Sequence, residues 1–123
     1  SVVATALADD GPDGDRVRAR LRGERLAAPS VLDLEVASVL RRLAATGSLD
    51  DRRAVLALDD LRSLRIERAP HLRLLDRCWE LRHSLTVYDA AYVALAELTS
   101  STLLTGDSRL AAAPGTTCTV EVL

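Results

Sequence analysis

The chain has 123 residues, with 16 basic and 18 acidic side chains and a net charge of −2 at pH 7. This size favours one domain over residues 1–123, and the charge argues against strong non-specific binding to nucleic acid, which depends on cationic contacts with phosphates. Hydrophobic residues make up 48% of the sequence without a run of roughly 18 that would form a membrane helix, so a soluble, cytoplasmic protein is expected.

Every basic residue is an arginine. The lack of lysine excludes a phosphate-binding P-loop, which needs one, and enzymes that form a Schiff base through lysine. The two histidines and two cysteines have no metal-ligand spacing, and the glycine-rich dinucleotide motif and the nucleophile-elbow motif of serine hydrolases are absent. An enzyme with this sequence must therefore act through carboxylates.

Apolar periodicity and turn residues predict an alternation of helices and strands. In chain order, the patterns predict a helix over 1–8, an acidic turn over 9–14, helices over 15–23, 30–45 and 49–61, strands over 26–28 and 64–69, helices over 71–82 and 86–98, a strand over 101–105, a helix over 108–113 and a strand over 117–122. On the helix over 49–61, the apolar side is expected to comprise Val55, Leu56, Leu58 and Leu61. Such interleaving is typical of an α/β fold with a parallel sheet and helices on both faces.

Three carboxylates, Glu35, Asp89 and Asp107, lie at positions where a charged side chain calls for an explanation. Asp107 directly follows the uncharged strand over 101–105, at the carboxyl edge where open α/β sheets place ligands. The other two have apolar neighbours on their own helices, and burying a lone carboxylate costs several kcal/mol unless it is paired. These neighbours are Val31, Leu32 and Val39 around Glu35, and Leu85, Tyr92 and Val93 around Asp89.

Each acid also has a purely structural interpretation. Asp89 completes a capping box with Thr86, and Asp107 fits a turn or the N-cap of the next helix. Glu35 can turn to solvent or pair with Arg42. The alternative to these structural interpretations is that the three acids bind one metal site together. Carboxylates from separate elements are the oxygen ligands that Mg²⁺ and Mn²⁺ prefer, in sites suited to phosphodiester hydrolysis.

Three stretches together resemble the PIN-domain ribonucleases, specifically the VapC-type toxins of bacterial toxin–antitoxin pairs. Pro29–Arg42 is similar to the family helix that carries a glutamate, here Glu35. Leu85–Glu97 is similar to the helix whose aspartate follows a tyrosine, here Asp89, and Leu103–Leu110 to the strand end with a Thr-x-Asp pattern, here Asp107. Their order and spacing agree over essentially the whole chain.

The resemblance implies a three-layer α/β/α sandwich with a central parallel sheet. It also implies Mg²⁺- or Mn²⁺-dependent endoribonuclease activity, with Glu35, Asp89 and Asp107 as catalytic metal ligands. Ser1 and Thr105 are then expected to hold these ligands or a water in place, and Arg109 to contact a phosphate of the RNA.

The family pattern has a further aspartate two residues before a serine that matches Ser1. That aspartate is not in the sequence, and we expect residues before Ser1 in the native protein to supply it together with the first strand. Asp9 and Asp10 are poor substitutes, because they lie in a turn at the far end of the first helix.

The resemblance also implies partners: an RNA substrate (tRNA, rRNA or mRNA), a cognate antitoxin protein and a second copy in a homodimer. The helices over 1–8 and 49–61 are candidate contact faces. Two other functions stay open at this point. One is a catalytically silent PIN-like module that binds proteins, and the other is a Mg²⁺-dependent phosphatase or phosphotransferase, against which the lack of lysine counts.

Overall fold

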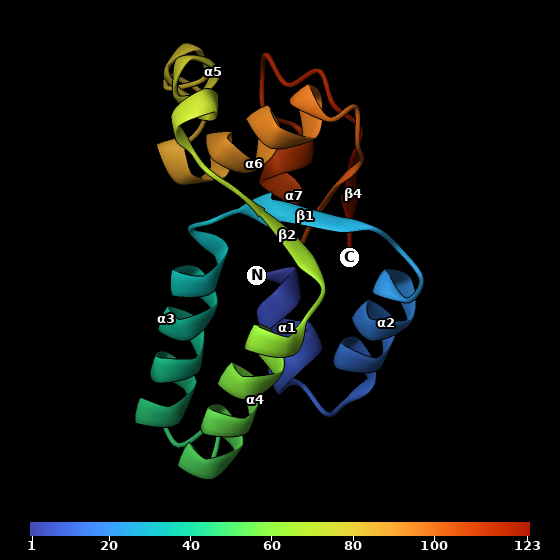
Figure 1. The fold of residues 1–123 in the computed structure, drawn as a ribbon, viewed down its shortest axis with the longest axis vertical. Coiled ribbons are helices and arrows are strands. Elements are labelled where there is room, and N and C mark those ends of the chain that lie inside the picture. The colour runs from blue at the N-terminus through green and yellow to red at the C-terminus, as the bar shows by residue number, and fades with distance from the viewer. The chain divides into compact units, whose positions relative to one another are not determined.

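The computed structural model describes residues 1–123, which divide into two units (Figure 1). The first unit comprises Ser1–Leu26 and Leu32–Ile66, and the second comprises Ala27–Val31 and Glu67–Leu123. The second unit therefore includes a short N-terminal segment that supplies most of its first strand. A single domain over 1–123 stays a prediction.

Four helices form the first unit: α1 (Val2–Ala8), α2 (Pro12–Leu21), α3 (Leu32–Ala45) and α4 (Asp51–Ser63). Helix α1 packs against the other three. Its buried residues are Ala4 and Ala6, whose small side chains let neighbouring helices approach closely. Helix α3 contributes Leu32, Val36 and Leu40 to this core, at the spacing of one helix face.

Two arginines satisfy the carbonyl groups at the end of α1. The Arg18 guanidinium donates to the carbonyls of Ala6 at 2.9 Å and Asp9 at 2.7 Å, and Arg53 of α4 donates to the carbonyl of Leu7 at 2.8 Å. The last carbonyls of a helix have no partner within it, so these bonds remove a cost of folding. They also fix α1 against α2 and α4.

The buried side of α4 differs from the prediction. Its buried residues are Ala54, Ala57 and Leu61, whereas Val55 and Leu56 are 57% and 51% exposed. Ala54, Ala57 and Leu61 follow a spacing of three and four residues, so they share one face, and Val55 and Leu56 lie off it. The prediction is therefore confirmed for Leu61 and wrong for Val55 and Leu56, and Leu58 is half-buried.

The strands of the second unit form two pairs. β1 (Leu26–Pro29) pairs with β2 (Ile66–Ala69), and β3 (Leu103–Thr105) pairs in parallel with β4 (Val120–Val122). The register of the second pair places Leu103 opposite Val120 and Thr105 opposite Val122. The α/β fold class is confirmed, with parallel strands and helices between them.

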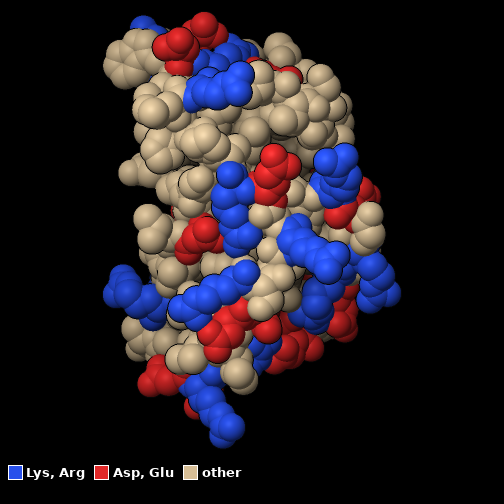
Figure 2. All heavy atoms as spheres, viewed as in Figure 1, with Lys and Arg blue, Asp and Glu red and all other residues tan.

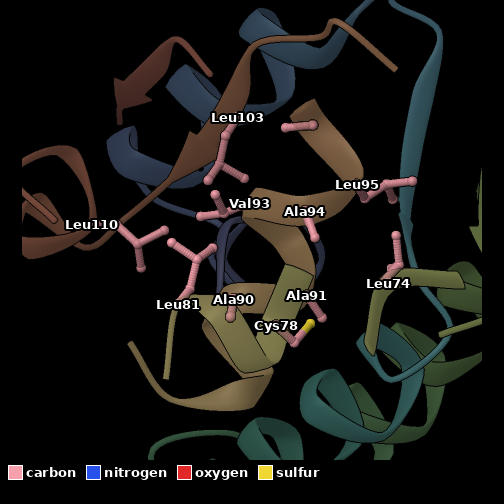
Figure 3. Packing of buried hydrophobic residues seen from close by; sticks show 11 residues of the cluster. Leu74, Cys78, Leu81, Ala90, Ala91, Val93, Ala94, Leu95, Leu103 and Leu110 are labelled. Atoms are coloured by element: carbon pink, nitrogen blue, oxygen red, sulfur yellow. The ribbon is translucent and has the colours of Figure 1, made fainter. Parts of the chain in front are cut away.

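Helix α6 (Val87–Leu98) lies at the centre of the second unit's core, with six buried residues between Ala90 and Ala96. The 3₁₀ helix η1 (Leu72–Leu74) and helix α5 (Leu75–Glu80) occupy the region predicted as one helix over 71–82, and both pack against α6. Figure 3 shows Leu103 of β3, Leu110 of α7 (Ser108–Ala111) and Leu81 turned toward the same cluster. Cys78 is buried there, which raises the pKa of its thiol, and both cysteines are free.

Candidate active site

Asp107 stands between β3 and α7, where the sequence pattern places it. Its carboxylate caps α7 by accepting a hydrogen bond from the backbone N–H of Arg109 at 2.9 Å. Its own backbone N–H donates to the hydroxyl of Thr105 at 3.0 Å. Thr105 therefore fixes the turn that presents Asp107, two residues after the strand ends.

The guanidinium of Arg109 lies directly on this carboxylate. Nε is 3.0 Å from Oδ1 and Nη2 is 2.7 Å from Oδ2 of Asp107, which is a two-point contact. The hydrogen bond from this side chain lowers the pKa of Asp107 to about 2, helped by the N–H bond of the cap. Asp107 is therefore ionised at neutral pH. The Arg109 side chain is 89% exposed, so its contact is open to solvent.

Asp89 lies in the first turn of α6 and is half-buried. The hydroxyl of Thr86 accepts a hydrogen bond from the Asp89 N–H at 3.2 Å and donates one to Oδ2 of the same residue at 3.1 Å. The predicted helix cap is thus confirmed, and it orients the carboxylate as well.

The charges of Asp89 and Asp107 act on the same cation. Asp107 raises the pKa of Arg109 through its hydrogen bond and its charge, and the charge of Asp89 adds to this effect. The second unit therefore brings together two of the three predicted acids, one arginine and the hydroxyls of Thr86 and Thr105. These groups come from the start of α6 and the end of β3.

Glu35 belongs to the first unit, where it is half-buried in the first turn of α3. Leu32 and Val36 beside it are buried, as its predicted apolar surroundings require. That Glu35 joins Asp89 and Asp107 in one site stays a prediction.

Ser1 also lies in the first unit and caps α1. Its hydroxyl accepts a hydrogen bond from the Ala4 N–H at 3.4 Å, and its carbonyl accepts bonds from the N–H and the hydroxyl of Thr5. In the structure, Ser1 therefore caps the start of α1. Its expected role of holding a ligand or water stays a prediction.

The donor atoms of the second unit are of the type that a hard divalent cation binds. Asp89 and Asp107 offer carboxylate oxygens, and Mg²⁺ commonly takes one or two carboxylates while the remaining positions go to waters and substrate phosphates. The number of donor side chains is small, since no three His, Cys, Asp or Glu side chains form a group that could hold a metal ion. A third protein ligand is therefore part of the proposal below.

One ion-pair network of the second unit has no signal in the sequence. Arg77 of α5 donates two hydrogen bonds to Glu97, at 2.7 and 3.1 Å, and a third to the carbonyl of Gly115 at 2.7 Å. Glu97 also accepts from the N–H of Thr117 at 2.9 Å. The network ties the end of α6 to the loop before β4. The residues that these bonds join are 20 to 38 positions apart along the chain, so no local pattern reveals them.

The family of the chain follows from its similarity to known proteins. Residues 1–115 match the PIN domain family. The chain belongs to this family. The match includes Glu35, Asp89 and Asp107, together with Ser1, Thr105 and Arg109.

Relatives of this PIN domain in Mycobacterium tuberculosis are similar over most of their length. Ribonuclease VapC1 is 44% identical over 124 residues, which cover 100% of this chain and 93% of the relative. Ribonuclease VapC9 is 40% identical over 126 residues, covering 100% and 94%, and Ribonuclease VapC12 is 36% identical over 112 residues, covering 91% and 87%. In this PIN domain, none of the helices combines the length and apolar character needed to cross a membrane.

Proposed function

We propose that this PIN domain is a Mg²⁺- or Mn²⁺-dependent endoribonuclease, the toxin of a type II toxin–antitoxin pair. The observation that carries the proposal is the placement of Asp89 and Asp107 around Arg109, at a helix start and a strand end, in a chain similar to proteins named as VapC ribonucleases. The proposed metal ligands are Asp89, Asp107 and Glu35.

Each residue of the proposed site has a task. Thr86 orients the carboxylate of Asp89, and Thr105 fixes the backbone of Asp107. The carboxylate of Asp89 then has a fixed orientation, whereas Asp107 becomes a ligand once the exposed guanidinium of Arg109 moves off its two oxygens. Asp89 and Asp107 would hold a divalent ion, which would supply Lewis-acid chemistry for activating a water and offsetting charge on the phosphate.

Arg109 is proposed to contact a phosphate of the RNA. Its guanidinium is planar, permanently charged and suited to two-point contacts with phosphate oxygens. Because its side chain is largely exposed beside Asp107, it is accessible to RNA at the place where cleavage is proposed.

The proposed substrate is single-stranded RNA or the loops of structured RNA, including tRNA, rRNA and mRNA, where bases are accessible. Aromatic residues make up only 2% of the chain, so stacking on an aromatic surface is not the proposed mode of recognition. The proposed protein partners are a cognate antitoxin and a second copy of the chain, in the cytoplasm.

The test is cleavage of a mixed tRNA and mRNA pool by the full-length protein, purified free of antitoxin, with Mg²⁺ or Mn²⁺ and with EDTA. Asp89→Asn removes a ligand charge but keeps the backbone N–H that bonds to Thr86, so the helix cap survives. We expect cleavage to require the divalent ion and to fall roughly a hundredfold or more in this variant. Asp51→Asn, at an exposed acid in α4, is the matched control and should cleave normally.

Full cleavage in EDTA would contradict the metal dependence, and full cleavage by Asp89→Asn would contradict the role of that carboxylate. No cleavage by the folded wild-type protein with either ion would contradict the ribonuclease and favour a catalytically silent PIN-like module. Thermal unfolding of each variant shows whether a loss of cleavage reflects a loss of folding.

A further inference from the structure

The ion pair between Arg109 and Asp107 uses both oxygens of the carboxylate. Nε of Arg109 lies 3.0 Å from Oδ1 and 3.2 Å from Oδ2, and Nη2 lies 2.7 Å from Oδ2. Oδ1 also accepts a hydrogen bond from the backbone N–H of Arg109 at 2.9 Å. The guanidinium therefore lies on the same atoms that the proposed metal site takes from Asp107.

A guanidinium and a divalent ion cannot share these oxygens. The guanidinium carries only N–H donors and has no lone pair to offer a metal. A metal ion bound at Oδ1 or Oδ2 would lie directly beside it, where two positive charges repel each other. One of the two cations must then leave the carboxylate.

The guanidinium can leave without disturbing the turn between β3 and α7. The Arg109 side chain is 89% exposed, and exposed ion pairs contribute little to stability because water solvates both partners well. The cap of α7 does not depend on this side chain, since its donor is the backbone N–H of Arg109. The hydroxyl of Thr105 accepts from the Asp107 N–H independently. The carboxylate therefore keeps its place when the guanidinium moves.

Arg77, by contrast, is fixed in place. Its guanidinium donates to two carboxylates and to the carbonyl of Gly115, and only 31% of its side chain is exposed. Losing one of these partners leaves the others. Of these two arginines, Arg109 is the one that can exchange its partner.

The charges of the site favour a different partner for Arg109 once a divalent ion is bound. The charges of Asp107 and Asp89 both act on its guanidinium and raise its pKa. A metal ion held by these carboxylates offsets the negative charge that attracts the guanidinium. A phosphate of RNA offers two oxygens and a negative charge, which a guanidinium binds by the same two-point contact that it makes with a carboxylate.

We propose that Arg109 exchanges partners: it pairs with Asp107 while no divalent ion is bound, and it turns to a phosphate of the RNA when that carboxylate becomes a metal ligand. This inference rests on the proposed function, because it takes Asp107 as a ligand and Arg109 as a phosphate contact. It adds that the two roles are coupled. The metal strengthens RNA binding, and RNA strengthens metal binding by the same factor.

The first measurement is the affinity of the full-length protein for Mn²⁺, by calorimetry and without RNA. Arg109→Ala keeps the backbone N–H that caps α7 and removes the competing cation, so it should bind Mn²⁺ about two- to fivefold more tightly than the wild type. Arg16→Ala is the matched control, because it removes the arginine of another exposed ion pair, with Asp13 in α2. It changes the net charge equally and should bind Mn²⁺ as the wild type does.

The second measurement is the binding of a labelled single-stranded RNA in EDTA, by fluorescence anisotropy at about 50 mM salt. Asp107→Asn keeps the cap of α7, because asparagine also caps helices, but it loses the ion pair. It therefore releases Arg109 without a metal, and RNA affinity should rise. In the Arg109→Ala background the same change releases no cation, so the gain in affinity should be smaller by roughly twofold or more.

The surface of the chain suits this second measurement. On the face shown in Figure 2, basic side chains lie among acidic ones. The release of one arginine should therefore change RNA binding measurably, because the cations on that face do not form a basic area of their own.

Equal Mn²⁺ affinity of Arg109→Ala and the wild type would overturn the proposal, as would an equal tightening in Arg16→Ala. Equal gains in RNA affinity from Asp107→Asn in the two backgrounds would overturn it as well. Absence of Mn²⁺ binding in every variant would overturn the metal site of the proposed function together with this inference, whereas binding of equal strength overturns only this inference. Circular dichroism shows whether each variant is folded.

Discussion

Arg77 and Glu97 form the most buried ion pair described in this PIN domain, with 31% and 14% of their side chains exposed. Hydrogen bonds from Arg77 lower the pKa of Glu97 to about 2, from an ordinary value of 4.5, and the bonds from Thr117 add to the shift. A pair that keeps this geometry stabilises more than a surface pair, because solvent screens it less.

Glu97→Gln is expected to lower the free energy of unfolding by about 2 kcal/mol at pH 7. The pKa of Glu97 is depressed in the folded state, so its stabilisation is fully present above about pH 4.5 and disappears as the pH falls toward 2. Urea unfolding at pH 7, 4 and 3 measures the difference between variant and wild type. Glu67→Gln, at an exposed glutamate, serves as the control. A difference that stays constant from pH 7 to pH 3 would show that the charge of Glu97 is not its source.

Gly14 is a second residue whose role appears only in the folded chain. A Cβ at this position would lie 1.8 Å from the carbonyl oxygen of Asp9, which is backbone and cannot move aside cheaply. In an ordinary helix position, Gly→Ala is stabilising by up to about 1 kcal/mol. At Gly14, the carbonyl group of Asp9 lies so close to α2 that an added Cβ would instead be destabilising.

Gly14→Ala is therefore expected to destabilise the protein by about 1–3 kcal/mol, measured by urea or thermal unfolding. Gly106→Ala is the matched control: nothing lies within 4 Å of its added Cβ, so stability should change little. Equal stability of the two variants would contradict the close contact at Gly14.

At the scale of elements, the sequence patterns place almost every helix and strand. The helix predicted over 86–98 is α6 (Val87–Leu98), and Thr86 caps it as the spacing to Asp89 indicates. Predicted and observed ends differ more where the pattern is short: the helix over 71–82 becomes η1 and α5. Caps and turns are local interactions, which explains why the sequence reveals them.

Thr86→Val tests this cap. It removes the hydroxyl that accepts from Asp89 N–H and donates to the Asp89 carboxylate, at nearly unchanged side-chain volume. We expect a loss of about 1 kcal/mol in stability, whereas Thr86→Ser should retain most of it. The measurement is thermal unfolding of both variants, and identical losses in the two would mean that the hydroxyl does not cap α6.

At the scale of the whole molecule, charge limits how RNA binds. The chain has a net charge of −2, and several arginines, including Arg18, Arg53 and Arg77, are engaged by acids or carbonyls of the same chain. These engaged arginines are not available to replace counterions along an RNA backbone. The proposed ribonuclease must therefore depend on its site, and on divalent ions there, more than on a general basic surface.

The expected consequence is a shallow salt dependence. For the Asp89→Asn variant, which binds without cleaving under the proposed function, the slope of log K against log salt concentration should be no steeper than about −3. Fluorescence anisotropy with a labelled single-stranded RNA over a range of salt concentrations measures it. A slope near −6 would reveal an extended phosphate-binding surface instead.

The sequence by itself determined the family, the α/β class, the order of the elements and the positions of Asp89 and Asp107 at a helix start and a strand end. These properties follow from apolar periodicity, capping residues and short motifs, all of which act within a few residues. The pairing of β3 with β4, the contact of Arg77 with Glu97 and the bond from Arg53 to the carbonyl of Leu7 join residues 17 to 46 positions apart. Only the tertiary structure decided these, together with the face of α4 that is buried, because they depend on which surfaces meet once the chain has folded.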